Sequence, residues 1–258
     1  MKEKYDSYGG ERIATGIPGL DEMLGGGLPR NRCYIIMGGP GAGKTILGLQ
    51  FLYMGALEND DVGLYVSLDE SPAHIRENTK SFNWTLEELE KAGLFTIVDA
   101  SPIRAIPGDV KLGGITIGKR DFSLVSFLNV VRTEAQKVKA KRIVVDSLTI
   151  LAYQFQEEPE RRRALLDLFR AFTEMDATFI ITSELRTSIL ERPVQPEEFL
   201  AHGAIVLYTM PDGNRAIHIE KMRGIQHDTK LRPYQINENG IEIFPQERVF
   251  KTQKTSRE

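Results

Sequence analysis

The chain has 258 residues, of which 41% are hydrophobic and 27% are charged, and its formal net charge is −3. This composition is ordinary for a globular protein, and the charge excludes a global basic field that would attract nucleic acid or an anionic membrane. With one cysteine, no apolar signal segment and no apolar run of membrane-spanning length, we expect a cytoplasmic protein without an intramolecular disulfide or a membrane partner.

The N-terminal part predicts a short helical turn that comes before a buried strand. Leu20, Met23 and Leu24 have the spacing of one helix face, and the triplet Gly25–Gly27 ends the turn. The triplet lacks a following Gly-Lys-Ser/Thr, so we interpret it as a tight turn and not as a phosphate-binding loop. The apolar residues 33–37 then predict a buried strand, in which Cys33 packs.

The segment Gly38–Thr45 fits the P-loop pattern G-x-x-x-x-G-K-S/T and lies between that strand and an apolar helix. Glycines allow backbone N–H groups to approach phosphate oxygens, and the helix N-terminus favours the same negative charge. Lys44 supplies a catalytic cation at the outer phosphates, and the Thr45 hydroxyl is a ligand for Mg²⁺. The sequence therefore predicts a site for the phosphates of a nucleotide with Mg²⁺, formed by Gly38, Gly39, Pro40, Gly41, Ala42, Gly43, Lys44, Thr45 and Ile46.

Helices and buried strands alternate over the next hundred residues. The helix after the P-loop ends near residues 59–61, and a strand follows at 62–68. Ser71 is the expected N-cap of a helix that starts at Pro72 and runs through Thr79. The remaining expected elements are a helix from 84 to 93, a strand at 95–98, an irregular stretch at 101–121, a helix over 122–138 and a strand at 142–147.

The C-terminal part predicts a change from parallel to antiparallel strands. A connection at 148–159 leads into a helix with apolar residues from 165 to 175, a strand at 177–184 and a second irregular stretch at 186–198. Asp-Gly within residues 211–214 predicts a hairpin between strands 204–210 and 215–222. Two short strands around residues 237–240 complete the list of expected elements.

This order of elements predicts an α/β fold with a P-loop. Alternating strands and helices imply a mostly parallel central sheet with helices on both faces, and the hairpins add antiparallel strands at one edge. We find no repeat and no linker, so we expect a flexible arm at 1–11, a single domain at 12–247 and a polar tail at 248–258.

Acidic residues follow two of the buried strands, at the sheet edge where ligands of parallel sheets bind. Asp146 ends the strand at 142–147, and we expect it to hold Mg²⁺ together with Thr45; the alternative is an acid that caps the next turn. Glu70 is our candidate for the general base, with Asp69 as its helper. Both acids are also favourable at a helix N-terminus, and spacing alone leaves these two interpretations open.

The strand at 177–184 ends in the polar residues Thr182, Ser183 and Glu184. Such a cluster beside the P-loop is suited to sensing the γ-phosphate, and we include Glu184 among the nucleotide-binding residues. The alternative is a hydrophilic exit from a buried strand, and the sequence leaves both open.

Five segments together resemble the KaiC-like branch of the RecA/RadA superfamily: TGIPGLDEMLGGGLP, GGPGAGKT, YVSLDESP, RIVVDS and EKMRGIQHD. The resemblance covers about residues 12–245 and is to single-domain members. It implies a RecA-type ATPase core, and it implies that the catalytic glutamate is among the acids after the second strand, which supports Glu70.

The resemblance also implies a site shared between subunits. ATP lies at the subunit interface in this family, and a K-x-R-G segment of the neighbour reaches its phosphates. Here that segment contains Lys221 and Arg223, with His227 downstream. The implied assembly is a ring of identical subunits, expected to be a hexamer. Autokinase activity is doubtful, because Glu198 and Phe199 stand where the two-domain clock members of the family have a Ser-Thr pair.

These observations lead to the hypothesis of a slow, Mg²⁺-dependent ATPase that acts as an oligomeric regulatory switch and has an unidentified protein partner. One alternative is a DNA-dependent recombination or repair ATPase of the RadA type. It rests on basic residues in the two irregular stretches: Arg104, Lys111, Lys119, Arg120, Arg186 and Arg192. The other alternative is a nucleotide-sensing scaffold with little turnover.

Overall fold

The computed structural model describes residues 10–100, 110–112, 115–117, 124–152, 154–155, 157–185, 192 and 194–249. Nearly all of the expected arm at 1–11, most of the stretch at 101–121 and nearly all of the tail at 248–258 lie outside these residues. None of the described helices combines the length and the apolar character needed to cross a bilayer.

The main sheet of the described residues has nine strands in the order β13-β12-β11-β10-β3-β9-β8-β4-β5. The six strands from β10 to β5 are parallel neighbours, and β10 to β13 pair antiparallel. This order confirms the α/β prediction with a mostly parallel sheet and antiparallel strands at one edge. The strands are β3 (Cys33–Gly38), β4 (Gly63–Ser67), β5 (Phe95–Asp99), β8 (Arg142–Asp146), β9 (Thr178–Glu184), β10 (Gly203–Thr209), β11 (Arg215–Met222), β12 (Arg232–Asn237) and β13 (Gly240–Ile243).

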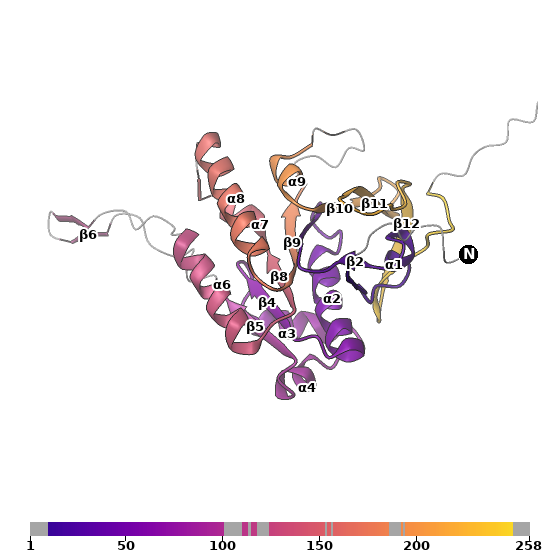
Figure 1. The fold of residues 1–258 in the computed structure, drawn as a ribbon, viewed down its shortest axis with the longest axis horizontal. Coiled ribbons are helices and arrows are strands. Elements are labelled where there is room, and N and C mark those ends of the chain that lie inside the picture. The colour runs from indigo at the N-terminus through magenta and orange to yellow at the C-terminus, as the bar shows by residue number, and fades with distance from the viewer. Residues whose placement is uncertain are drawn as a thin grey trace, which may run out of the picture.

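Helices cover both faces of this sheet (Figure 1). Successive side chains of a strand point to opposite faces, so Tyr34 and Ile36 of β3 join one core cluster while Ile35 and Met37 join the other. The helix α2 packs in the first cluster, and α6 and α8 pack in the second. The helices are α1 (Leu20–Met23), α2 (Lys44–Asn59), α3 (Pro72–Thr79), α4 (Leu86–Lys91), α6 (Leu124–Val138), α7 (Leu148–Ala152), α8 (Glu158–Thr173) and α9 (Pro196–Leu200).

The structure contains several short elements that the sequence analysis did not predict. The stretches expected to be irregular contain the antiparallel pair β6 (Val110–Leu112) and β7 (Ile115–Ile117) and the helix α9. The expected connection at 148–159 contains α7, and the N-terminal part adds the pair β1 (Arg12–Ile13) and β2 (Leu28–Pro29). Elements of two to five residues are too short to show a hydrophobic period. In α9, however, Pro196 at the first helical position and the acids Glu197 and Glu198 in the first turn were a readable signal.

A buried arginine joins several segments at the start of β8. The Arg142 side chain is fully buried, and its Nε and Nη2 donate to Asp61 Oδ2 at 3.0 and 2.9 Å. Its Nη1 donates to the carbonyls of Ala14 and Phe51 at 2.9 and 3.1 Å, and the guanidinium lies 4.7 Å from the centre of the Phe51 ring. A buried charge of this kind is stable only while its partners remain in place.

Gly55 of α2 provides the space for this arginine, and Gly55→Ala is expected to destabilise the fold. A Cβ at this position would lie 2.1 Å from Arg142 Nε, whose side chain is fixed by four hydrogen bonds. We expect a loss of about 1–3 kcal/mol from overpacking, although alanine is the better helix former. Urea unfolding followed by circular dichroism measures this loss.

Leu57→Ala on the same helix is the control for this variant. Because Leu57 is exposed, its replacement should change stability by less than about 0.5 kcal/mol. An unchanged or higher stability of Gly55→Ala would contradict the packing argument.

Candidate functional site

The predicted P-loop connects the end of β3 to the start of α2. Gly41 and Gly43 have φ angles of 72° and 92°, a left-handed conformation that favours glycine. A Cβ placed on Gly39 or Gly41 would have no atom within 4 Å, so this side of the loop faces open space. The opposite side is packed, because a Cβ on Gly43 would lie 2.9 Å from Ile236. A loop with open backbone on one side and the α2 N-terminus beside it fits a bound phosphate group.

Lys44, at the first residue of α2, reaches back over this loop. Its Nζ donates to the carbonyls of Gly38 and Gly39 at 2.9 and 3.1 Å. Partial burial lowers the pKa of Lys44, and the carboxylates of Glu184 and Asp146 oppose this effect. The two acids therefore favour the charged ammonium at the place where an outer phosphate would lie.

Asp146 lies at the end of β8, and its carboxylate accepts hydrogen bonds from three hydroxyl groups. Thr45 Oγ1 and Tyr65 OH donate to Oδ2 at 2.6 and 2.5 Å, and Thr182 Oγ1 donates to Oδ1. The Tyr65 side chain is buried, and burial and the Asp146 carboxylate raise the pKa of its phenol well above the usual value. The phenol is consequently a hydrogen-bond donor over the whole physiological pH range.

Glu70 follows β4, and its backbone and side chain are both held by hydrogen bonds. Ser67 Oγ donates to the Glu70 carbonyl at 2.5 Å, and the Glu70 N–H donates to Ser67 Oγ at 3.2 Å. Asn78 Nδ2 donates to Glu70 Oε2 at 2.9 Å, whereas Asp69 is an exposed residue. Glu70 is thus the less exposed of the two acids.

These side chains line one cavity of about 110 Å³. That volume is enough for a metal ion together with phosphate oxygens. The lining residues are Lys44, Thr45, Tyr65, Ser67, Asp69, Glu70, Asp146, Ser147 and Glu184, which include six residues of the sequence prediction.

Lys221 and Arg223 lie elsewhere, at the end of β11. Lys221 pairs with Ala204 of β10, and Ala204 pairs with Ile35 of β3. Because Ile35 comes three residues before Gly38, Lys221 is offset from the start of the P-loop by about 10 Å along the strand direction. Its Nζ donates to the carbonyls of residues 198, 199 and 201 at 2.7, 3.3 and 2.7 Å, and Arg223 Nη2 donates to the Phe199 carbonyl at 2.8 Å. Burial, together with the neighbouring Arg223, lowers the pKa of Lys221 to about 8.

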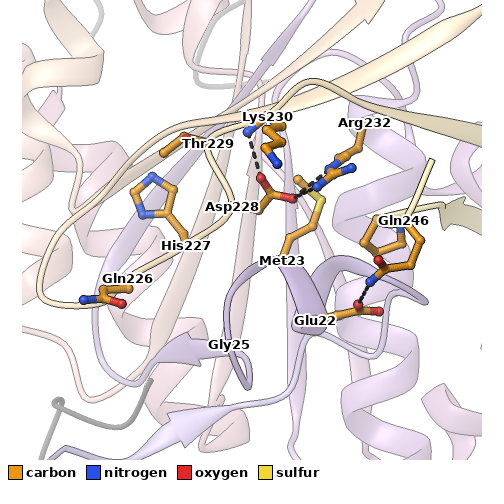
Figure 2. A pocket seen from close by; sticks show the side chains of 11 residues that line it. Glu22, Met23, Gly25, Gln226, His227, Asp228, Thr229, Lys230, Arg232 and Gln246 are labelled. Carbon is orange, nitrogen blue, oxygen red and sulfur yellow. Dashed lines mark hydrogen bonds and ion pairs between the residues drawn. The ribbon is translucent and has the colours of Figure 1, made fainter. Parts of the chain in front are cut away.

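His227 lines a separate and larger cavity of about 420 Å³ (Figure 2). Asp228 also lines it and accepts from the Lys230 N–H at 2.8 Å and from Arg232 Nε at 2.7 Å. Residues of α1 and of the 245–246 segment complete the lining, and the P-loop does not contribute. Within one chain, the structure therefore does not bring Lys221, Arg223 or His227 to the predicted phosphate site.

Three residues that line this cavity were not selected from the sequence: Tyr65, Ser67 and Ser147. Tyr65 contacts Asp146, and Ser67 holds the backbone of Glu70. A tyrosine inside a buried strand usually has a partner for its hydroxyl, and this signal could have identified Tyr65. The neighbouring Thr149 was also missed, although its Oγ1 accepts from the Glu184 N–H at 2.8 Å.

Of the basic residues considered for DNA binding, Arg192 is the one whose side chain the structure describes. It forms a bidentate ion pair with Glu198 at 2.6 and 2.8 Å, and both side chains are almost fully buried. Arg192 is therefore tied to the protein interior. The side chains of the other five lie outside the described residues: Arg104, Lys111, Lys119, Arg120 and Arg186.

Comparisons with known proteins agree on the relatives of this chain. The family model "ATPase: KaiC" matches residues 13–248. A UPF0273 protein of Pyrococcus furiosus is 35% identical over 247 residues, which are 93% of this chain and 96% of that protein. The circadian clock oscillator protein KaiC of Synechococcus elongatus is 32% identical over 251 residues, 95% of this chain and 46% of that protein. The chain thus spans about half the length of the clock proteins it matches.

A solved structure shows the same fold. The crystal structure of a KaiC-like protein from the archaeon Pyrococcus horikoshii superposes with a TM-score of 0.76 at 34% sequence identity. The match covers 91% of this chain and 99% of that chain. Since the archaeal relatives match over nearly their full length, the similarity extends over the whole sheet and not only over the P-loop.

Proposed function

The chain belongs to the KaiC family of ATPases, and from this premise we propose that it is a slow, Mg²⁺-dependent ATP hydrolase that works as a ring of identical subunits. The observation that carries the proposal is the Thr45–Asp146 hydrogen bond of 2.6 Å, which lies in a cavity that Lys44 and Glu70 also line. One cation, one base and one hydroxyl–carboxylate pair in this space are the parts that phosphoryl transfer to water needs.

In this proposal the P-loop binds the phosphates of ATP, and Lys44 neutralises charge on the outer ones. Thr45 and Asp146 would hold Mg²⁺, which neutralises phosphate charge when it is bound. Glu70 accepts a proton from the water whose oxygen attacks the γ-phosphorus. The bond between the γ-phosphorus and the bridging oxygen breaks, and ADP leaves with that oxygen. Asp69 and Glu184 line the same cavity and add negative charge to it.

The site is completed by the next subunit, whose Lys221, Arg223 and His227 approach the nucleotide. The register of β11, β10 and β3 supports this arrangement, because it keeps Lys221 away from the P-loop of its own chain. Arg223 is exposed and can therefore reach a neighbouring molecule. A closed ring, a hexamer in our proposal, is the simplest assembly in which every site receives such a residue.

We further propose that this cycle serves a regulatory switch in the cytoplasm, with a protein partner that has yet to be identified. We do not extend the proposal to DNA, because the described Arg192 is buried in an ion pair with Glu198. Autokinase activity is not proposed either, because Glu198 and Phe199 offer no hydroxyl group to a phosphate.

Phosphate release and assembly, measured together, test the proposal. We expect turnover that requires Mg²⁺, is slower than the typical enzyme value of about 10 s⁻¹ and rises with protein concentration as rings form. Size-exclusion chromatography with light scattering, with and without a non-hydrolysable ATP analogue, reports the assembly. Assembly with no phosphate release would favour the nucleotide-sensing scaffold over the hydrolase. Full turnover by a monomer would refute the shared site.

A further inference from the structure

The Asp146 carboxylate is held on one side by a residue outside the P-loop and outside its own strand. Tyr65 OH lies 2.5 Å from Asp146 Oδ2, the same oxygen that accepts from Thr45 Oγ1 at 2.6 Å. Thr182 donates to the other oxygen. Hydrogen bonds from hydroxyl groups to a carboxylate at these distances are charge-assisted and strong. Two donors on one oxygen and one on the other leave the carboxylate little freedom to rotate.

The three hydroxyl groups are not equivalent. A threonine hydroxyl has one proton and two lone pairs, so Thr45 can donate to Asp146 and still offer a lone pair to a cation. Tyr65 sits in the middle of β4, and its register partner on β8 is Val144, two residues before Asp146. Its side chain is 1% exposed and packs in the core cluster that contains Val144 and Leu52. The phenol oxygen is thus fixed by a rigid, buried ring.

We propose that Tyr65 is a positioning residue for the divalent cation: its buried hydroxyl orients the Asp146 carboxylate so that Thr45 and Asp146 act on Mg²⁺ together. The inference rests on the proposed function, because it assumes that the cavity holds a Mg²⁺–nucleotide complex. It adds to that function a residue from a neighbouring strand, which acts on the cation only through Asp146. Loss of such an outer partner typically lowers metal affinity about 10- to 100-fold.

The test uses the full chain, the fluorescent nucleotide mant-ADP and Mg²⁺. The dissociation constant of mant-ADP is measured in EDTA and along a titration of free Mg²⁺. For Tyr65→Phe we expect the wild-type constant in EDTA, and a Mg²⁺ concentration for half-maximal tightening that is about 10- to 100-fold higher. Tyr34→Phe is the matched control, because the buried Tyr34 hydroxyl donates to the Pro29 carbonyl at 2.6 Å, outside the site. Its Mg²⁺ requirement should equal that of wild type.

A double-mutant cycle separates positioning from general loosening of the core. If Tyr65 acts through Asp146, Tyr65→Phe should have no further effect on the Mg²⁺ titration in an Asp146→Asn background. An unchanged Mg²⁺ requirement in Tyr65→Phe would overturn the inference, as would an equal increase in Tyr34→Phe or a full additional effect in the Asp146→Asn background. If wild type binds mant-ADP without any response to Mg²⁺, the proposed Mg²⁺-dependent function fails and this inference fails with it.

Discussion

Replacing Glu70 by glutamine is expected to slow ATP hydrolysis by about 10²- to 10⁴-fold, which is the usual contribution of a positioned general base. The amide has nearly the same shape as the carboxylate but cannot accept the proton of the attacking water. The Ser67 bonds involve only the Glu70 backbone, so they are retained in the variant. Steady-state phosphate release at saturating ATP and Mg²⁺ measures the effect, and the affinity for ATP should not change.

Asp69→Asn is the matched control for this variant. Asp69 lines the same cavity and is the preceding residue, but it is exposed, whereas Glu70 is half-buried and held by Asn78 at 2.9 Å. We expect Asp69→Asn to retain at least a tenth of the wild-type rate. Equal rates for wild type and Glu70→Gln would remove Glu70 from the role of base. A larger loss in Asp69→Asn than in Glu70→Gln would assign that role to Asp69.

The elements that the sequence predicted well are those whose signal is local. The strands β3, β8 and β9 are short apolar runs buried on both faces, and α2 starts where the P-loop pattern ends. The meeting of Glu70 and Asp146 in one cavity also follows from a general rule, because parallel strands end at the same sheet edge. For these features the type and order of elements were sufficient.

The features that the sequence did not reveal depend on register and on side-chain direction between distant segments. Tyr65 reaches Asp146 because β4 pairs with β8 and the phenol points toward the strand end. Neither the pairing nor the side-chain direction can be predicted from the residues around Tyr65. The contacts of Lys221 with α9 likewise depend on side-chain direction between segments that are distant in the sequence. They join residues more than twenty positions apart, through a helix of five residues that has no hydrophobic period.

Those α9 contacts also decide which residue best tests the shared site. Lys221 directs its ammonium to three backbone carbonyls, and its pKa is lowered to about 8 by burial and by Arg223. Arg223 is exposed, and a guanidinium keeps its charge at any working pH. It has five N–H donors, of which Nη2 contacts the Phe199 carbonyl at 2.8 Å. Arg223 is therefore the better candidate for a contact with the phosphates of a neighbouring subunit.

Arg223→Ala is expected to lower ATP turnover by about 10³- to 10⁵-fold, the range for an arginine supplied by another subunit. ATP binding to the P-loop should remain, because the loop belongs to the same chain and is unaltered. Arg170→Ala on α8 is the control: Arg170 is 81% exposed and pairs with Glu174, and its loss should not change the rate. Full activity of Arg223→Ala would exclude the residue from the site.

Mixing two inactive variants separates a residue that acts in a neighbour from one that acts in its own chain. Lys44→Ala subunits lack the P-loop cation but keep Arg223, and Arg223→Ala subunits have the opposite defect. In rings assembled from equal amounts, a P-loop with Lys44 faces an intact Arg223 at about one site in four. We therefore expect up to about a quarter of the wild-type rate from two preparations that are each inactive. If Arg223 served its own chain, neither subunit would ever hold a complete site, and the mixture would stay inactive at every ratio.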